Sequence, residues 1–188
     1  MSATVTRADY LDAALALLAT EGTAGLKVGR LCRSLGVTTG SFYHHFDGLP
    51  DLVESLMRHW EQESTARVAL AVAEVSDPAD AIAVLKRTAV DLPHAAETHI
   101  RAWALRDPGV AAVQRRVDAE RLAVLEAAIG AVVGPGREAR DLATLGLTVL
   151  VGFQHARDTG DLAELGRLLD HFESRIEAVA QQHDRAGR

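Results

Sequence analysis

Apolar residues recur every three or four positions along most of the chain, and no segment alternates apolar and polar residues as a β-strand does. One apolar stripe lies within residues 8–18 and a second within residues 28–35, and the segment EGTAGLK with its two glycines separates them. A longer stripe begins at Pro50 and predicts a helix to about Val75. The spacing therefore predicts an all-α protein.

A short, punctuated segment joins the second stripe to the longer one. Gly36 directly follows residues 28–35, at a position where a left-handed helix end is common. Thr38 then precedes a short stretch in which Phe42 and Phe46 stand four residues apart. The pattern predicts a helix, a tight turn and a short second helix, which is the order of a helix-turn-helix motif.

Proline and glycine mark the helices of the back half. Pro78, Pro93 and Pro108 each suit the first turn of a helix. Glycines then break the chain before two last helices, one over residues 142–156 that is apolar nearly all round and one beginning at Leu162. About nine helices are expected in all.

The composition predicts a folded, soluble protein of the cytoplasm. The 188 residues are 48% hydrophobic, enough to bury a core. The longest uncharged apolar run, residues 142–154, is shorter than the roughly 20 residues that span a membrane, and no export signal is visible. Cys32 is the single cysteine and lies on an apolar stripe, which predicts a buried, inert thiol. The polar residues 181–188 are expected to fray.

The net charge of −6 by itself argues against a nucleic-acid partner, but the distribution of charge along the chain removes this objection. Residues 1–50 hold four basic and four acidic side chains, so the acidic excess belongs to the later part. Enzyme signatures such as HExxH, GxSxG and CxxC are absent, and the adjacent pair His44 and His45 points about 100° apart on a helix. The sequence predicts no catalytic site, metal site or cofactor.

A helix-turn-helix explains the polar side chains around Phe42 and Phe46. The second helix of such a motif enters the major groove, and the first crosses the phosphate backbone. With both phenylalanines inward, the hydroxyls and imidazoles of the short helix are available to bases and phosphates. Lys27, Arg30 and Arg33 recur every three residues on the supporting helix, which indicates either a phosphate-facing patch or an ordinary solvated face.

The stretch VGRLCRSLGVTTGSFYHHFDGLPDLV resembles the DNA-binding region of TetR-type (tetracycline-repressor-like) transcriptional regulators. The resemblance extends over about residues 6–60 and implies a DNA-binding domain at 1–60, with the motif at about 27–46, and a helical effector-binding and dimerisation domain at 61–188. It also implies a homodimer in which each recognition helix docks on one half-site. The predicted DNA contacts are Lys27, Arg30, Thr38, Thr39, Gly40, Ser41, Tyr43, His44 and His45.

One position departs from the family pattern. Many members have a lysine in the first turn of the fourth helix, where it meets a phosphate, and this chain has Leu49 there. The departure predicts one ionic contact fewer and a flatter salt dependence of binding.

The predicted effector pocket depends on four residues of the back half. His99 and Trp103 share an apolar helical stripe, which suits either a pocket wall or a core histidine beside a core tryptophan, and the second interpretation is favoured. Thr148 and His155 suit either the pocket or a dimer interface. The last two helices are the expected dimer surface, the alternative being that they complete a monomeric core.

The sequence thus predicts a DNA-binding transcriptional regulator, in the first place a homodimeric repressor released from a double-stranded DNA operator by a small-molecule effector. An activator of the same family is the first alternative. A small-molecule-binding helical protein without operator binding is the second. No membrane association is expected.

Overall fold

The computed structural model describes residues 5–73, 75–157 and 160–186. Over these residues the chain forms nine α-helices, one 3-10 turn and no strand, which confirms the all-α prediction. The elements are α1 (Arg7–Glu21), η1 (Gly22–Gly25), α2 (Val28–Leu35), α3 (Thr39–Tyr43), α4 (Leu49–Ala73), α5 (Pro78–Val90), α6 (His94–Ala104), α7 (Pro108–Val133), α8 (Arg137–Ala156) and α9 (Leu162–Ala186). None of the helices in this part of the chain is long and apolar enough to cross a membrane.

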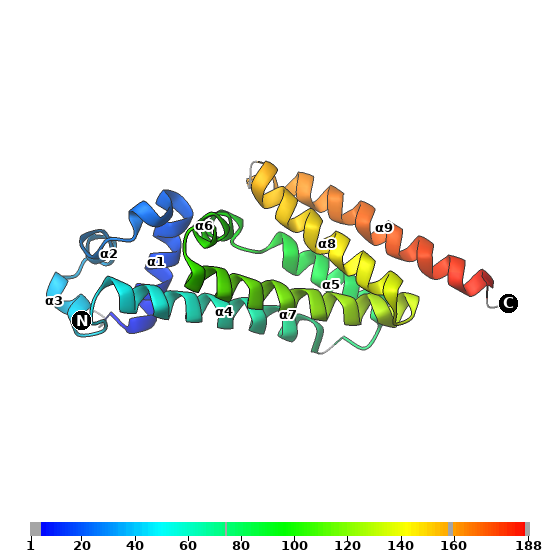
Figure 1. Ribbon diagram of the computed structural model, residues 1–188, viewed down its shortest axis with the longest axis horizontal. Helices are drawn as coiled ribbons and strands as arrows, with labels where there is room; N and C mark the ends of the chain where they lie inside the picture. Colours follow the sequence, from blue (N-terminus) through cyan, green and yellow to red (C-terminus); the bar gives the residue numbers. More distant parts are fainter. Residues whose placement is uncertain (1–4, 74, 158–159, 187–188) are drawn as a thin grey trace. The chain divides into compact units, whose positions relative to one another are not determined.

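The helices form two compact units. Unit 1 contains residues 1–63 and 93–115, and unit 2 contains residues 64–92 and 116–188, so that α4 and α7 contribute to both. Within unit 1, α6 packs on α1 and η1 (Figure 1).

Side-chain and glycine caps delimit the helices of unit 1. Thr6 and Asp9 form a reciprocal capping box at the start of α1. Gly36 ends α2 in the left-handed conformation, with φ 67° and ψ 30°, as predicted. Two residues later, Thr38 caps α3, because its Oγ1 accepts a hydrogen bond from the backbone N–H of Ser41. These local contacts turn the chain sharply between α2 and α3.

An aromatic cluster forms the core beneath α3. Tyr10, Phe42 and Phe46 are all 2% exposed or less. The ring of Tyr10 meets each phenylalanine edge-on, with centroids 5.8 Å apart, and the two phenylalanine rings stack at 5.3 Å. Because α3 has only five residues, its position depends on this cluster rather than on its own helical stability.

The α6 helix is part of unit 1 because its apolar face packs on α1 and η1. Ala96 and Ile100 are buried, and α6 lies against η1, where Gly22 has φ 62° and the chain turns. A Cβ atom at Gly22 would stand 3.0 Å from Nδ1 of His99, so a glycine is needed for both conformation and close approach.

Unit 2 is a helical layer built around α8 and α9, which pack side by side (Figure 1). Gly146 allows close contact between α8 and α9, since a Cβ there would lie 2.7 Å from Cζ of Phe172, whereas a Cβ at Gly152 would meet no atom within 4 Å. The start of α8 at Arg137 precedes the predicted Leu142, because charged residues with ion pairs form its first turns and hide the apolar pattern. The expected fraying from residue 181 is also wrong for the described part, since α9 continues to Ala186.

Candidate DNA-binding surface and effector cavity

The α3 helix presents most of its polar side chains outward. Phe42 and Phe46 are buried, so the other sides of the helix and its N-terminal turn meet solvent. Tyr43 is 61% exposed. Five of the predicted DNA contacts on α3 and its two capping positions are exposed, and together they form the recognition surface: Thr38, Thr39, Gly40, Tyr43 and His44.

Two predicted contacts do not belong to this surface. Ser41 is half-buried, and its Oγ accepts a hydrogen bond of 3.1 Å from the hydroxyl of Tyr10. His45 is half-buried as well, and its Nε2 donates to the carbonyl oxygen of Val5 at 3.1 Å, because a carbonyl can only accept. Both side chains hold α3 against the segment around α1 instead of presenting their polar atoms outward.

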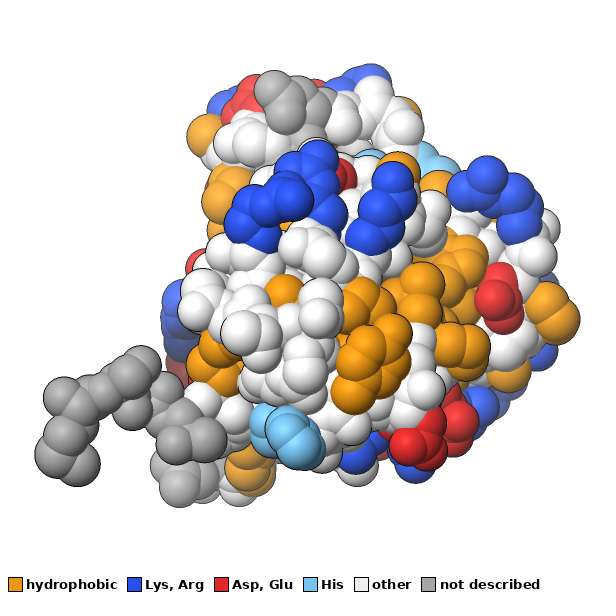
Figure 2. Space-filling model, turned by 90° about the vertical axis from the view of Figure 1, so that its left-hand side faces the viewer, with side chains coloured by type: hydrophobic (Ala, Val, Ile, Leu, Met, Phe, Trp, Pro, Cys, Tyr) orange, Lys and Arg blue, Asp and Glu red, His pale blue; other side chains and the backbone are white. Residues whose placement is uncertain are grey.

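The basic side chains of α2 differ in their availability. Lys27 immediately precedes α2 and is exposed. Arg30 is also exposed, but its guanidinium forms an ion pair of 2.8 Å with Glu21. A Cβ atom added at Gly29, between them, would meet no other atom within 4 Å, so the backbone is open to a close partner such as a phosphate. Figure 2 looks onto the α2 and α3 end, where basic side chains and a histidine are visible at the surface.

Sequence reasoning missed Arg7. Its guanidinium lies 4.6 Å from the ring centroid of Phe46 and donates hydrogen bonds to Ser55 at 2.6 Å and to Asp51 at 3.2 Å. The backbone N–H of Asp47 is the main cause that lowers the pKa of Asp51, and Arg7 adds to it. Partners more than 40 residues apart in sequence leave no local pattern, so only the structure identifies Arg7 as the tie between α1 and α4 beside α3.

Leu49 occupies the position at which the family pattern has a lysine. Leu49 is the first residue of α4 and is half-buried. It follows Gly48 at the end of the turn that leaves α3. The first side chain of α4 is therefore aliphatic, and the cation nearest in the described contacts of this first turn is Arg7, which pairs with Asp51.

The sequence of this region matches a known family. Residues 11–56 match the family model described as bacterial regulatory proteins, tetR family. The chain carries a TetR-family DNA-binding domain. The matched residues contain the α2–turn–α3 unit described above, which is the helix-turn-helix of this domain. No curated protein sequence shows a significant similarity to the chain.

Solved structures share the fold along most of the chain. A transcriptional regulator from Rhodococcus sp. Rha1 is 20% identical, with a TM-score of 0.75 over 95% of this chain and 97% of that one. A TetR transcription regulator from Haloarcula marismortui is 17% identical, with a TM-score of 0.75 over 90% and 96%. A transcriptional regulator from Saccharomonospora viridis in complex with choline is 14% identical, with a TM-score of 0.74 over 88% and 94%. The TM-scores establish a common fold, and at identities this low the comparison extends no further than the fold.

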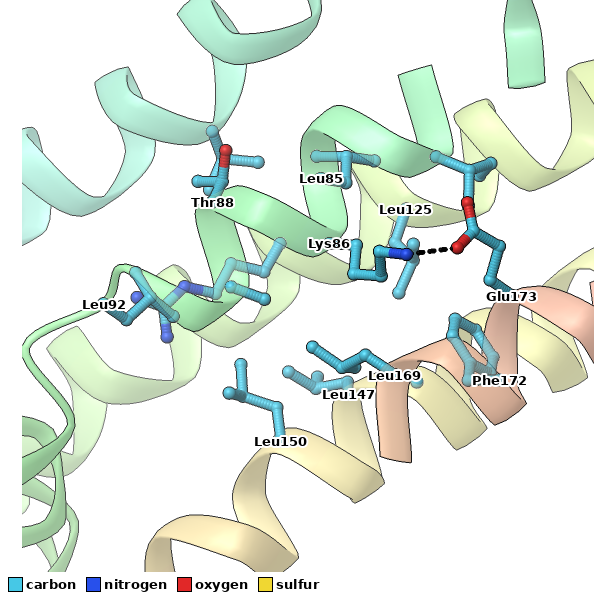
Figure 3. A pocket seen from close by; sticks show the side chains of 15 residues that line it. Leu85, Lys86, Thr88, Leu92, Leu125, Leu147, Leu150, Leu169, Phe172 and Glu173 are labelled. Carbon is cyan, nitrogen blue, oxygen red and sulfur yellow. Dashed lines mark hydrogen bonds and ion pairs between the residues drawn. The ribbon is translucent and has the colours of Figure 1, made fainter. Parts of the chain in front are cut away.

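Unit 2 contains a cavity between its helices. It holds about 700 Å³ of space that no atom fills, part of it open to solvent. The lining residues are Val68, Ile82, Leu85, Lys86, Thr88, Ala89, Leu92, Arg121, Leu125, Gly146, Leu147, Leu150, Leu169, Phe172 and Glu173. Leucines from several helices converge below the α5 segment that carries Lys86 (Figure 3). A concave, mostly apolar lining of this kind is typical of a small-molecule site.

None of the four residues predicted for an effector pocket lines this cavity. His99 and Trp103 lie on α6, which is part of unit 1, and both are half-buried there. Thr148 and His155 lie on α8 but are exposed. The periodicity that finds an apolar stripe does not say which helix will cover it.

Proposed function

We propose that the protein is a homodimeric repressor that binds an operator through α3 and releases it when a small molecule occupies the unit 2 cavity. The exposure of the recognition surface is the observation that carries this proposal. Hydroxyl, phenol and imidazole groups there suit base edges and phosphates. Lys27 and Arg30 are the proposed backbone contacts, and residues 1–60 the proposed DNA-binding part.

The proposed dimer surface is the outer face of α8 and α9. Leu145 is 48% exposed on α8, and Thr148 and His155 follow it at helical spacing with their side chains also exposed. Leu162 and Leu168 are exposed on α9. Large exposed apolar side chains on adjacent helices favour an interface between two copies of the chain.

Release requires that the effector bind one conformation of the dimer better than the other. The continuous helix α4 joins the DNA-binding part to the cavity, because it begins at Leu49 and carries the lining residue Val68. A shift of α4 on ligand binding would change the spacing of the two recognition helices relative to successive major grooves. By linkage, operator DNA must weaken effector binding by the same factor as effector weakens DNA binding.

Operator binding is tested by selecting ligands for the full chain from a pool of random double-stranded DNA, followed by gel shifts at low salt. We expect a near-palindromic sequence, because a two-fold dimer reads two half-sites. Tyr43→Ala and His44→Ala should weaken the specific complex, whereas Arg137→Ala, an exposed change in unit 2, should not. A folded dimer without any specific shift at low salt would refute the regulator and support a ligand-binding protein without an operator.

Dimerisation and direction of control have separate tests. Leu145→Glu should shift the mass in solution from dimer to monomer, and Leu70→Glu, a matched change at a leucine 72% exposed on α4, should not. For direction, deletion of the gene should raise transcription from the promoter that carries the selected site. A fall in transcription would show an activator instead.

A further inference from the structure

We propose that Asp51 is a positioning residue for the recognition helix α3, and that DNA binding requires its negative charge even though DNA is itself a polyanion. The carboxylate of Asp51, together with Arg7, fixes the turn of residues 44–48 that leads from α3 into α4 (Figure 1). Neither side chain belongs to the recognition surface. The inference rests on the proposed function, because it assigns a role in DNA binding through α3.

The carboxylate of Asp51 uses both of its oxygens. Oδ2 accepts a hydrogen bond of 3.1 Å from the backbone N–H of Asp47, within the turn that leaves α3. Oδ1 accepts from the guanidinium of Arg7 at 3.2 Å and from the hydroxyl of Ser55 at 3.2 Å. An ionised carboxylate is a pure acceptor, so it can accept from all of these donors at once. The side chain therefore connects the turn, α1 and α4.

Arg7 connects this carboxylate to the core beneath α3. Its guanidinium lies 4.6 Å from the ring centroid of Phe46, and that ring stacks on Phe42 of α3 with centroids 5.3 Å apart. Nη2 of Arg7 also donates to the hydroxyl of Ser55 at 2.6 Å. Asp51 holds the guanidinium in this place, so a change in the carboxylate should affect Phe46 and, through it, α3.

The arrangement differs from an ordinary exposed ion pair, which contributes little because water solvates both charges. The Asp51 side chain is 29% exposed, and Ser55, which contacts both charged groups, is buried. The backbone N–H of Asp47 is the largest cause of the lowered pKa of Asp51, ahead of Ser55 and Arg7. The ionised carboxylate is therefore bound chiefly to the turn itself, and Arg7 adds to this.

Positioning and electrostatics predict opposite effects on DNA binding when the charge of Asp51 is removed. The five residues of α3 cannot hold a helix alone, so a looser turn lowers the fraction of protein in which α3 can bind. The apparent DNA affinity falls in proportion to this fraction. Loss of a negative charge near a polyanion has the opposite effect and by itself raises the affinity. The direction of the change therefore identifies the role of Asp51.

The test compares Asp51→Asn with Asp47→Asn in gel shifts on the selected operator DNA. The amide introduced at position 51 has one acceptor oxygen, which cannot serve both the Asp47 N–H and the Arg7 guanidinium. Asp47→Asn removes the same charge at an exposed position of the same turn and keeps its backbone N–H. We expect Asp51→Asn to weaken binding by about fivefold and Asp47→Asn to bind as tightly as the unmodified protein or more tightly. Unchanged or tighter binding by Asp51→Asn overturns the proposal.

Arg7→Met separates positioning from a direct contact of Arg7 with a phosphate. If Arg7 acts through Asp51, Arg7→Met should weaken binding about as much as Asp51→Asn, and the double variant should bind about as well as either single variant. The slope of log affinity against log salt should not change. A slope flatter by about 0.9 in Arg7→Met, with additive effects in the double variant, would show a phosphate contact and overturn the proposal.

Hydrogen exchange without DNA distinguishes positioning from a general loss of stability. The amides of His45, Phe46 and Asp47 donate hydrogen bonds at the end of α3 and in its turn. In Asp51→Asn their exchange should speed up by about the factor that the DNA affinity loses, while the amides of α1 exchange as in the unmodified protein. Asp47→Asn should leave all of them unchanged. Equal acceleration throughout unit 1 would show a merely structural role and overturn the proposal.

The two measurements also separate this inference from the proposed function. Specific DNA binding by the unmodified protein, with equal affinity in Asp51→Asn, refutes the positioning role and leaves the regulator intact. Absence of specific DNA binding by the unmodified protein refutes the regulator. In that case the exchange of the amides in the turn still decides whether Asp51 holds α3 in place.

Discussion

Removal of the Tyr10 hydroxyl should loosen the recognition helix without disturbing its core. The side chain is fully buried, and its hydroxyl donates to Ser41 on α3 at 3.1 Å. Burial raises the pKa of the Cys32 thiol on α2, and the Tyr10 hydroxyl only partly opposes this effect. Tyr10→Phe keeps the ring contacts with Phe42 and Phe46, so the perturbation is confined to these polar contacts.

The size of the effect follows from burial at both ends of the bond. A hydrogen bond within a protein contributes about 0.5–1.5 kcal/mol net, and loss of one buried partner lies in the upper part of the range. Ser41 is half-buried, so water can replace part of the lost bond. We expect the free energy of unfolding to fall by about 1 kcal/mol, or about fivefold in the equilibrium constant.

Loss of the hydrogen bond between Tyr10 and Ser41 should also weaken DNA binding. The five residues of α3 cannot hold a helix alone, so its ordered state depends on contacts with α1 and on the phenylalanine core. Partial disorder of α3 lowers the fraction of protein that can bind, and the apparent affinity falls in proportion. We expect DNA affinity to fall by about two- to fivefold for each recognition helix in Tyr10→Phe.

Unfolding in urea is measured by tryptophan fluorescence, since Trp60 is buried in unit 1. Ser41→Ala and the double variant complete a cycle with Tyr10→Phe, whose coupling energy should be about 1 kcal/mol. Tyr43→Phe is the matched control, because the same hydroxyl is lost at an exposed position of α3 and stability should not change. Additive single effects, or an unchanged stability in Tyr10→Phe, would show that the bond does not hold α3.

Three further predictions concern Leu49, two glycines and Lys86. Leu49→Lys should tighten DNA binding without altering sequence preference and steepen the log–log salt slope by about 0.9; an unchanged affinity across a salt titration would contradict it. Gly36→Ala should lower the free energy of unfolding in urea by about 1–2 kcal/mol, because φ is 67° there and an added Cβ is strained even though it meets no other atom. Gly29→Ala adds a Cβ in equally open space but in a helical conformation, so it should raise the free energy of unfolding by about 0.5–1 kcal/mol. Because the pKa of Lys86 is raised in the folded state, the ion pairs of this lysine should stabilise the fold fully below pH 10.5, the ordinary pKa of lysine. The stabilisation should be lost as pH rises through the higher pKa of the folded state. Lys86→Met should abolish this contribution when melting temperature is measured against pH.

Local patterns determined the elements of unit 1 and the position of its motif. The left-handed glycine at Gly36, the capping hydroxyl of Thr38 and the inward Phe42 are all properties of a few neighbouring residues, and the structure confirms each of them. Helical spacing likewise predicted nine helices, since an apolar stripe depends only on sequence neighbours. The start of α8 at Arg137 escaped this reasoning because polar first turns carry no stripe.

Contacts between distant segments decided what the candidate sites contain. Helical spacing predicted that Ser41 and His45 point outward. In the structure, the polar atoms of these two side chains form hydrogen bonds with Tyr10 and with Val5. His99 lies on α6, which packs on α1 and η1 in unit 1, and it is not among the residues that line the cavity of unit 2. Periodicity determines which face of a helix is apolar, whereas only the tertiary structure determines which partner buries that face and where a cavity is left.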